Sequence, residues 1–321
     1  MKLKALLIGC GDVGARYDLN RPDYVWSHAK AYSLSDEIEL TVTDADKDKA
    51  DKIAGTYQAR VMKEVHEKDY WNFDLISIAT PTITHFDYLK KILPGSSSVI
   101  ICEKPIVSSL QQADEILSSY KSSGCRVLVN YPRRFQPAYL TLKKRLNDFQ
   151  PASLRGIIIK YKRGFLNNAS HAIDLLEFLF EKPFDFKNFV IQKREFDAFE
   201  YDPTLTAACL YLDSPVNFAG ICRVTYPIFE IELFYTNARI AICDSGNEIR
   251  YYYNNENGFA ENEEERQVGI LDKYMLPVIN EALSLVRNTK NDDNFIQALE
   301  MNKKMLEIID PLKKKNATVS H

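Results

Sequence analysis

The chain has 321 residues, of which 45% are hydrophobic and 26% are charged, and its formal net charge at pH 7 is −3. This length suits two domains of ~100–200 residues each, and the small net charge argues against a general nucleic-acid-binding protein. No stretch approaches the ~20 consecutive apolar residues that span a bilayer, so we expect a cytoplasmic protein without a membrane partner.

The six cysteines show neither a C-x-x-C pair nor the spacing of a zinc site. Several lie in apolar runs that are typical of strands, which suits small core residues in a reducing cytoplasm. We therefore expect no metal site, and we expect these six to be ordinary thiols: Cys10, Cys102, Cys125, Cys209, Cys222 and Cys243.

The first predicted element is a buried parallel strand from Leu3 to Ile8, which is apolar apart from Lys4. A G-x-G-x-x-G pattern follows it directly, and such a turn brings the backbone close to a dinucleotide pyrophosphate. The first glycine allows the tight turn, the second the approach of the phosphates, and the third the packing of helix on strand. We assign cofactor binding to Gly9, Gly11, Asp12, Val13 and Gly14.

Residues 16–26 lack helical periodicity and contain Pro22. Helical character resumes near residues 27–32, with Ser27 as the predicted N-cap. We interpret the segment as a loop inserted into the first helix region. It is either a lid over a ligand or a surface loop.

The next predicted strand, Ile38 to Thr43, ends at Asp44. A carboxylate there hydrogen-bonds the adenine ribose of NAD and repels the extra phosphate of NADP. Asp44 lies 30 residues after Gly14, more than the usual ~20, and the inserted loop accounts for the excess. The alternative is that Asp44 only caps a helix over 46–54.

Further buried strands are predicted at 74–79, 99–102 and 126–129, alternating with helices from Thr82 and over 110–122. This alternation predicts a doubly wound parallel sheet of the Rossmann type, whose ligands bind at the carboxyl ends of the strands. Polar or small residues fall at those ends: Gly11, Asp44, Thr80, Lys104 and Asn130.

From about Pro151 consecutive strands without intervening helices predict a large, mainly antiparallel sheet. The strands are expected at 154–163, 186–196, 205–212, 216–224, 228–235, 238–244 and 249–253. Helices are predicted at 169–180, 271–288 and 293–310, and an exposed polar loop at 254–265. We expect an NAD-binding Rossmann domain at 1–131 and an α+β substrate and oligomerisation domain at 132–321, whose last helix can return to the first domain.

Five short motifs follow one another between residues 9 and 176: Gly9-Cys10-Gly11-Asp12-Val13-Gly14, Ala79-Thr80-Pro81-Thr82-Ile83-Thr84-His85, Glu103-Lys104-Pro105, Asn130-Tyr131-Pro132-Arg133-Arg134-Phe135 and Ser170-His171-Ala172-Ile173-Asp174-Leu175-Leu176. In this order they resemble the Gfo/Idh/MocA family of NAD(P)-dependent sugar and polyol oxidoreductases, related to glucose–fructose oxidoreductase and inositol dehydrogenase. The C-terminal sheet fits the family's second domain.

The resemblance implies that Lys104 lies beside the nicotinamide, touches the reacting hydroxyl and precedes a cis bond to Pro105. It makes His171 the proton acceptor or donor, because oxidation of a secondary alcohol releases a proton to a base. The alternatives are a surface salt bridge for Lys104 and a structural pairing of His171 with Asp174. The resemblance also assigns cofactor contacts to Ala79, Thr80, Pro81, His85, Glu103 and Lys104.

One position departs from the family pattern. The family usually has an aspartate four residues before the histidine, and this chain has Asn167 there. An amide forms hydrogen bonds but cannot take up a proton. Either Lys104 and His171 suffice, or the reaction differs from the usual dehydrogenation, or catalysis is lost, in that order of preference. The resemblance assigns catalytic roles to Lys104, His171 and Asn167.

Arg133 and Arg134 follow the last Rossmann strand and can clamp a carboxylate or phosphate of the substrate; a structural salt bridge is the alternative. His28 lies where the family often has a histidine near the cofactor or substrate. The expected substrate-binding residues are Lys104, Arg133, Arg134, Asn167, His171 and Asp174.

Together these observations predict an NAD-dependent oxidoreductase acting on a sugar or nucleotide sugar. A non-catalytic NAD(H)-binding regulator on the same fold is the alternative from another class. An NADP-linked reduction of a ketosugar or biliverdin-like compound is disfavoured by Asp44. By resemblance alone, we expect a homodimer or homotetramer.

Overall fold

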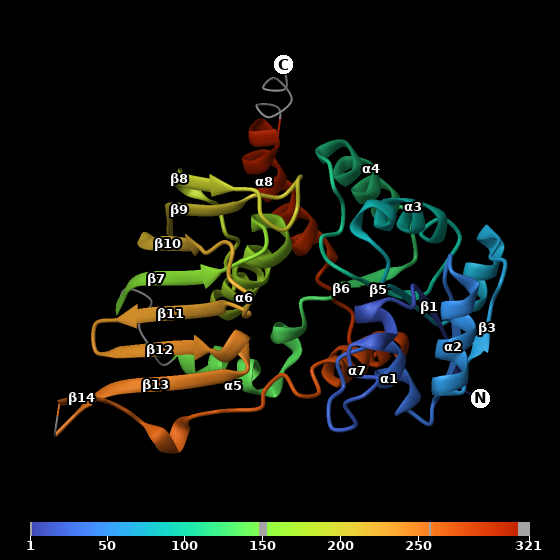
Figure 1. The fold of residues 1–321 in the computed structure, drawn as a ribbon, viewed down its shortest axis with the longest axis horizontal. Helices are drawn as coiled ribbons and strands as arrows, with labels where there is room; N and C mark the ends of the chain where they lie inside the picture. Colours follow the sequence, from blue (N-terminus) through green and yellow to red (C-terminus); the bar gives the residue numbers. More distant parts are fainter. Residues whose placement is uncertain (1, 148–152, 257, 314–321) are drawn as a thin grey trace. The chain divides into compact units, whose positions relative to one another are not determined.

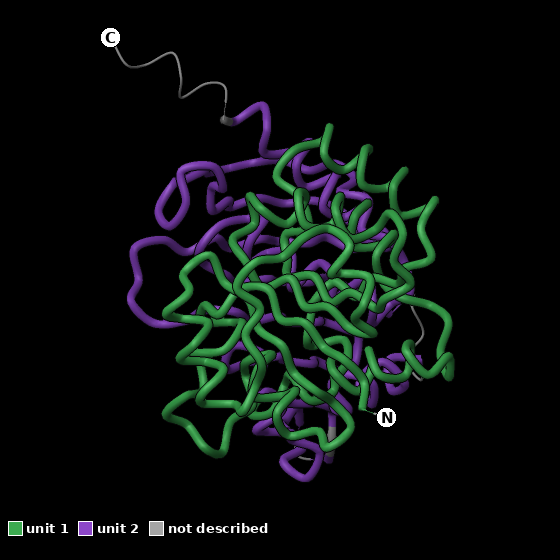
Figure 2. Tube along the Cα trace, turned by 90° about the vertical axis from the view of Figure 1, so that its right-hand side faces the viewer, with its two compact units in different colours: residues 1–135, 272–300 green, residues 136–271, 301–321 purple. Residues whose placement is uncertain are grey.

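The structure is a computed structural model that describes residues 2–147, 153–256 and 258–313. It divides into two compact units, distinguished by colour in Figure 2. The Rossmann unit comprises Met1–Phe135 and Asp272–Glu300, and the sheet unit comprises Gln136–Leu271 and Met301–His321. The chain therefore does not divide at a single point, since residues 272–300 belong with the N-terminal segment.

The Rossmann unit contains a six-stranded parallel sheet, in the order β3-β2-β1-β4-β5-β6. This confirms the predicted doubly wound sheet, whose inner strands are apolar because both faces are covered. The short β3 was not predicted, because two residues carry no periodicity. The strands are β1 (Leu3–Ile8), β2 (Ile38–Thr43), β3 (Arg60–Val61), β4 (Leu75–Ile78), β5 (Val99–Cys102) and β6 (Arg126–Val129).

Helices cover both faces of this sheet. One hydrophobic core contains side chains from β1, β2, α1, α2 and α7, so a helix late in the sequence completes the N-terminal fold. In Figure 1, α7 lies beside α1, and α3 lies beside α4. The α-helices are α1 (His28–Ser33), α2 (Lys47–Tyr57), α3 (Thr82–Ile92), α4 (Leu110–Lys121) and α7 (Met275–Val286); shorter helical turns are η1 (Asp12–Arg16), η2 (Glu67–Asn72) and η3 (Pro132–Phe135).

The sheet unit contains an eight-stranded sheet, in the order β14-β13-β12-β11-β7-β10-β9-β8. Its described neighbours pair antiparallel except β7 with β10, which are parallel. This confirms the mainly antiparallel sheet. The strands are β7 (Leu154–Tyr161), β8 (Lys187–Glu195), β9 (Thr204–Tyr211), β10 (Ser214–Gly220), β11 (Phe229–Tyr235), β12 (Ala238–Cys243), β13 (Glu248–Asn255) and β14 (Gly258–Glu261).

The most apolar helix of the sheet unit is α6 (Ser170–Phe180), which follows the turn η5 (Phe165–Ala169). Beneath it, the rings of Phe184 and Tyr211 stack with centroids 4.5 Å apart, and Phe165 packs edge-on against Phe218. Such aromatic pairs give a core large buried area and defined geometry. The other helical elements are α5 (Pro137–Leu146), η6 (Asp244–Gly246), η7 (Glu263–Glu265) and α8 (Phe295–Lys313), which begins in the Rossmann unit.

The expectation of a polar loop at 254–265 is wrong. Strand β13 extends to Asn255 and pairs with β14 over Asn255↔Gly258 to Tyr252↔Glu261, followed by η7. Residues of β14 are mostly exposed, so its sequence resembles that of a loop. An edge strand can be polar on both faces, which removes the alternation that identifies a strand.

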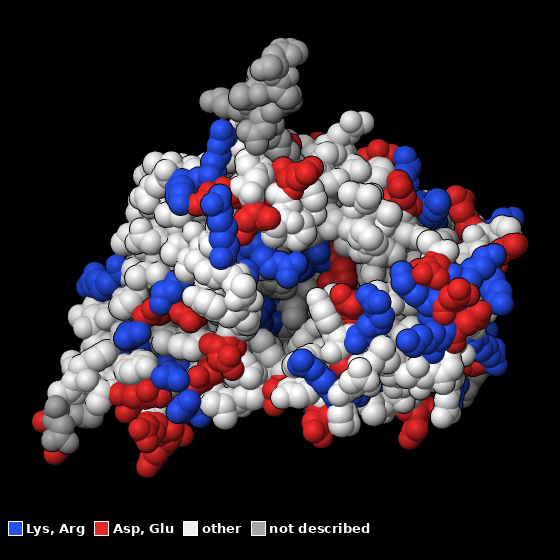
Figure 3. All heavy atoms as spheres, viewed as in Figure 1, with Lys and Arg blue, Asp and Glu red and all other residues white. Residues whose placement is uncertain are grey.

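Within the described ranges, no helix is long and apolar enough to cross a membrane. On the face of the molecule shown in Figure 3, acidic and basic side chains are interspersed. This distribution agrees with the small net charge of the chain.

Candidate functional site

The glycine turn has the geometry that a dinucleotide-binding loop requires. A Cβ on Gly14 would lie 2.1 Å from the carbonyl oxygen of Gly9, and one on Gly9 would lie 2.6 Å from that of Ala79. A Cβ on Gly11 would meet nothing within 4 Å. The turn thus packs tightly against β4 while open space remains beside Gly11, where a pyrophosphate would approach.

Asp44 connects the end of β2 to this turn. One carboxylate oxygen accepts a hydrogen bond from the Cys10 N–H at 2.7 Å, and the other accepts from the Asp46 N–H at 2.8 Å. Asp46, not Asp44, is the N-cap of α2. An ionised carboxylate has about four acceptor positions, so two remain for ribose hydroxyls.

Cys10 lies inside the turn but is not an activated thiol. Its side chain is buried, and its Sγ lies 3.9 Å from the Thr43 carbonyl oxygen. Burial, followed by the negative charge of Asp44, raises the pKa of this thiol to about 12. A thiol held protonated is a poor nucleophile, which agrees with its interpretation as a core residue.

The stretch after β4 is held by a buried histidine. His85 places one ring nitrogen 2.8 Å from the Pro105 carbonyl oxygen and the other 2.8 Å from the Thr80 carbonyl oxygen. Burial lowers the pKa of His85. The predicted cofactor residue His85 is therefore a bridge between the segments that follow β4 and β5. The expected cis bond between Lys104 and Pro105 is confirmed.

A buried carboxylate lies at the end of β5. Glu103 accepts hydrogen bonds from the His28 imidazole at 3.0 Å and the Asn130 amide at 2.6 Å. Burial raises the pKa of Glu103, but these hydrogen bonds and the charges of His28 and Lys104 outweigh it and leave the pKa below its ordinary value. The carboxylate is therefore ionised at neutral pH and lies close to the positive charge of Lys104.

Hydrogen bonds extend from this carboxylate into the core. The second ring nitrogen of His28 lies 2.9 Å from Ser77 Oγ, and the Tyr32 hydroxyl lies 2.6 Å from the same atom. Because ionised Glu103 can only accept, the His28 nitrogen facing it carries a hydrogen. Sequence reasoning missed Ser77 and Tyr32. The signal was present: Ser77 is a polar residue inside the otherwise apolar β4.

Hydrogen bonds hold both ends of the inserted loop, residues 16–26. The carboxylate of buried Asp18 accepts hydrogen bonds from the backbone N–H groups of Trp26 and Ser27 and from the Ser27 hydroxyl. The Tyr274 hydroxyl donates to the Trp26 carbonyl oxygen at 2.8 Å. Ser27 caps α1 as predicted. These contacts join the beginning of the inserted loop to the start of α1 and to Tyr274, which precedes α7.

Two arginines follow β6 on η3. Arg134 is buried and donates to Gln297 Oε1 at 3.0 Å, which is a structural contact within the Rossmann unit. Burial strongly raises the pKa of the Tyr274 hydroxyl, and the charge of Arg133 opposes this with a smaller lowering. Arg133 therefore lies close to Tyr274. Arg133 is therefore the better candidate of the two for a substrate anion.

The sheet unit supplies the second set of predicted residues. Asn167 lies on η5, and His171 and the buried Asp174 lie on α6. The His171 ring packs edge-on against the Phe229 ring, with ring centroids 6.4 Å apart. The Asn167 amide donates to the carboxylate of Asp202 at 2.8 Å, a residue that the sequence analysis did not identify.

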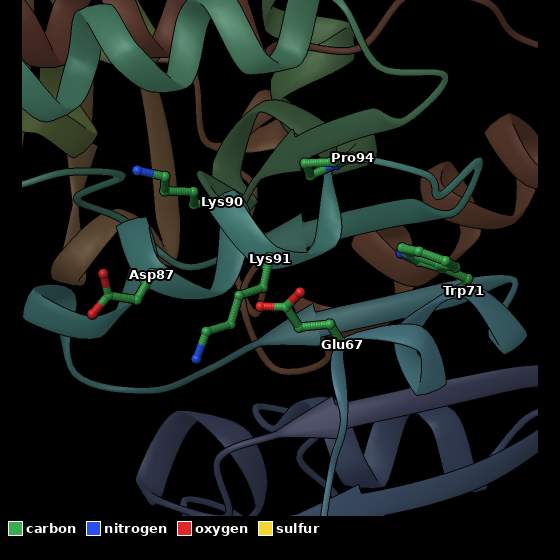
Figure 4. A pocket seen from close by; sticks show the side chains of 6 residues that line it. All are labelled: Glu67, Trp71, Asp87, Lys90, Lys91 and Pro94. Atoms are coloured by element: carbon green, nitrogen blue, oxygen red, sulfur yellow. The ribbon is translucent and has the colours of Figure 1, made fainter.

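A surface cavity of about 380 Å³ lies between η2 and α3. Its lining residues come from η2, which precedes β4, and from α3 and the turn after it, whereas the glycine turn follows β1. Figure 4 shows its lining residues, none of which belongs to the predicted sites: Glu67, Trp71, Asp87, Lys90, Lys91 and Pro94.

Comparison with known proteins agrees with this geometry. Residues 3–131 match a family model described as an oxidoreductase family with an NAD-binding Rossmann fold. The Rossmann segment of the chain thus matches the Gfo/Idh/MocA family, which confirms the predicted resemblance over these residues. Inositol 2-dehydrogenase of Rhizobium meliloti is 28% identical over 149 residues, which cover 46% of this chain and 42% of that protein. The chain thus matches less than half the length of this relative.

Solved structures share the fold of the chain across both units. UDP-N-acetylglucosamine 3-dehydrogenase GnnA from Acidithiobacillus ferrooxidans superposes with a TM-score of 0.74 at 17% identity, covering 98% of this chain and 99% of that one. A super-repressor mutant of Gal80p from Saccharomyces cerevisiae gives a TM-score of 0.75 at 14% identity, covering 100% and 97%. At these identities the likeness concerns the fold.

The glycine turn generates a first prediction. We expect Gly14→Ala to lower the free energy of unfolding by about 1–3 kcal/mol or more, because the alanine Cβ would overlap backbone atoms rather than a movable side chain. Gly11→Ala is the matched control, since Gly11 has a φ of −73° and open space around it. Urea denaturation checks both variants. Equal stability of the two would contradict the packing described.

The buried contact between His28 and Glu103 generates a second prediction. We expect His28→Phe to lower the free energy of unfolding at pH 7 by about 3 kcal/mol, because it removes the imidazole partner of a buried carboxylate. In the wild type the depressed pKa of Glu103 contributes stability that is complete above its ordinary value of 4.5 and is lost as the pH falls through its folded pKa.

The difference in the free energy of unfolding between the wild type and His28→Phe should therefore become smaller as the pH falls below 4.5, because protonation of Glu103 removes its unpaired charge. His66→Ala, which removes an exposed cap of η2, is the control and should cost about 1 kcal/mol at most. Denaturant titrations across this pH range test the pair. A deficit that is independent of pH would contradict the role of Glu103.

Proposed function

We propose that the protein is an NAD-dependent oxidoreductase that acts on a secondary hydroxyl or keto group of a sugar. The observation that carries the proposal is the convergence of a glycine turn, Asp44 and the Glu103–Lys104 pair at the carboxyl ends of β1, β2 and β5. This edge is where doubly wound sheets bind dinucleotides. NAD is favoured over NADP because a 2′-phosphate would face the Asp44 carboxylate.

Different residues of the chain bind the cofactor, orient the substrate and transfer the proton. The turn from Gly9 to Gly14 holds the pyrophosphate, and Asp44 holds the adenine ribose. Bound NAD would supply a hydride acceptor or donor. Lys104, whose position Glu103 fixes, orients the reacting oxygen, and His171 takes up or returns the proton of the hydroxyl.

A sugar or polyol is proposed as the substrate because a sequence relative is named inositol 2-dehydrogenase, and a protein with the same fold is named UDP-N-acetylglucosamine 3-dehydrogenase. Arg133 supports a nucleotide sugar, since a guanidinium suits a diphosphate. We also propose, from family resemblance, that the chain forms a homodimer or homotetramer.

A non-catalytic NAD(H)-binding regulator is the second candidate. Asn167 favours it, because an amide replaces the aspartate that the family usually carries, and the fold is shared with a super-repressor mutant of Gal80p. Since a fold does not determine a function, turnover decides between the two candidates.

The proposal predicts NADH formation, followed at 340 nm, when NAD⁺ and a panel of sugars and nucleotide sugars are added. Lys104→Ala should lower kcat by about 10²–10⁴-fold, as expected for loss of a group at the reacting oxygen. Lys121→Ala, an exposed residue at the end of α4, should keep the wild-type rate. Turnover that survives Lys104→Ala would contradict the assigned site, and NADH binding without turnover would favour the regulator.

A further inference from the structure

A buried serine interrupts the apolar strand β4. Ser77 is fully buried among the leucine and isoleucine residues of this strand. Its Oγ lies 2.6 Å from the Tyr32 hydroxyl and 2.9 Å from Nδ1 of His28, and both of these groups are buried as well. Polar groups are costly to bury without a partner. Replacing hydrogen-bonded partners together by apolar groups of the same shape is often nearly neutral for stability, so folding alone does not require this set.

The three groups lead from the core to the Glu103 carboxylate. His28 and Tyr32 lie four residues apart on α1 and therefore share one face of the helix. This face meets Ser77 on β4, the strand that pairs with β5. The other ring nitrogen of His28, Nε2, lies 3.0 Å from Glu103 Oε1, just after the end of β5. The imidazole is thus held at both nitrogens, which fixes the direction of the hydrogen that it donates to Glu103.

Tyr32 determines the orientation of the Ser77 hydroxyl. Burial raises the pKa of Tyr32, so its hydroxyl keeps the hydrogen and needs an acceptor. Among the residues that the structure describes, Ser77 is the hydrogen-bond partner found for this hydroxyl. Tyr32 therefore donates to Ser77 Oγ, and the Ser77 hydroxyl faces His28 with its remaining hydrogen-bonding capacity. A tyrosine in the core thereby supports the contact that His28 makes with Glu103.

The Glu103 carboxylate is sensitive to the orientation of His28. Burial raises the Glu103 pKa, and the hydrogen bond from His28 is the largest of the effects that lower it. A less well-oriented imidazole would therefore let Glu103 take up a proton at higher pH and lose the negative charge beside Lys104. The titratable groups that interact with the charge of Glu103 come from α1, α3, the end of β5 and the segment before α7: His28, His85, Cys102, Lys104 and Tyr274.

We propose that Tyr32 and Ser77 are positioning residues for the reaction, which act through His28 to hold the Glu103 carboxylate that fixes Lys104. The inference rests on the proposed function, in which Lys104 orients the reacting oxygen of the sugar. Tyr32 and Ser77 lie in the core of the Rossmann unit, so they affect turnover at a distance, through contacts that join α1, β4 and the end of β5.

The first test removes the central hydroxyl. Ser77→Ala separates Tyr32 from His28, and we expect kcat to fall about tenfold, because a misplaced catalytic group slows the reaction. Tyr32→Phe leaves the contact between Ser77 and His28 in place and should lower kcat about threefold, whereas Ser77→Thr keeps the hydroxyl and should stay within about twofold of the wild type. Ser98→Ala is the matched control. It removes another buried serine hydroxyl of the Rossmann unit, which donates to the Phe73 carbonyl oxygen, and it should keep the wild-type kcat.

The pH dependence separates this role from a purely structural one. The protonation state required of the proposed base, His171, is the same in both proteins and cancels in the ratio of kcat between Ser77→Ala and the wild type. Glu103 takes up a proton at higher pH in the variant, so this ratio should fall by a further factor of about three or more as the pH is lowered from about 7 to about 5. The ratio for Ser98→Ala should stay constant over the same range.

A double variant tests whether the effect passes through Lys104. Adding Ser77→Ala to Lys104→Ala should lower the residual kcat by less than about twofold, because the group on which the contacts act is already absent. A structural defect would lower kcat by the same factor in both backgrounds. Thermal unfolding establishes that each variant is folded, and Tyr32→Phe takes the place of Ser77→Ala if the latter does not fold.

The inference would be overturned by wild-type kcat in both Ser77→Ala and Tyr32→Phe, by a ratio of kcat that is independent of pH, or by equal losses with and without Lys104. Absence of turnover in the wild type would instead contradict the proposed function, on which the inference rests. The two failures are therefore distinguishable.

Discussion

The hydrogen bonds to the buried carboxylate of Glu103 connect the parts of the Rossmann unit from which the candidate site is built. One oxygen of this carboxylate accepts from His28 on α1 and from Asn130 after β6. His28 in turn reaches Ser77 on β4. A carboxylate this deeply buried is stable only when it is paired and hydrogen-bonded. Lys104 follows Glu103 directly in the chain, and the inserted loop leads into α1, which begins at His28.

The glycine turn depends on a second carboxylate. Asp44 accepts the Cys10 N–H, so the end of β2 and the turn after β1 are fixed relative to each other before any ligand arrives. This preorganisation lowers the entropic cost of binding a dinucleotide. A third carboxylate, Asp202, performs a comparable task in the sheet unit by holding the first turn of η5. Asp44 and Asp202 both accept backbone hydrogen bonds, and each thereby sets the direction of a polar chain segment.

Local patterns in the sequence were sufficient for the strands β1, β2, β4, β5 and β6, the glycine turn and the cap at Ser27, because each depends on neighbours in the chain. They did not identify β14, whose exposed edge position hides its alternation. Partners far apart in the sequence were also missed. Ser77 and His28 are 49 residues apart, and Asn167 and Asp202 are 35 apart. Contacts of this kind exist only after the fold has formed.

The central claim is that the Rossmann unit binds NAD through the glycine turn and Asp44. A fluorescence titration of the purified protein with NADH and, in parallel, with NADPH tests it most directly. We expect saturable binding of NADH and binding of NADPH at least about tenfold weaker, which corresponds to about 1.4 kcal/mol of repulsion at Asp44. Equal or tighter binding of NADPH would contradict the role of Asp44, and binding of neither would contradict the cofactor site itself.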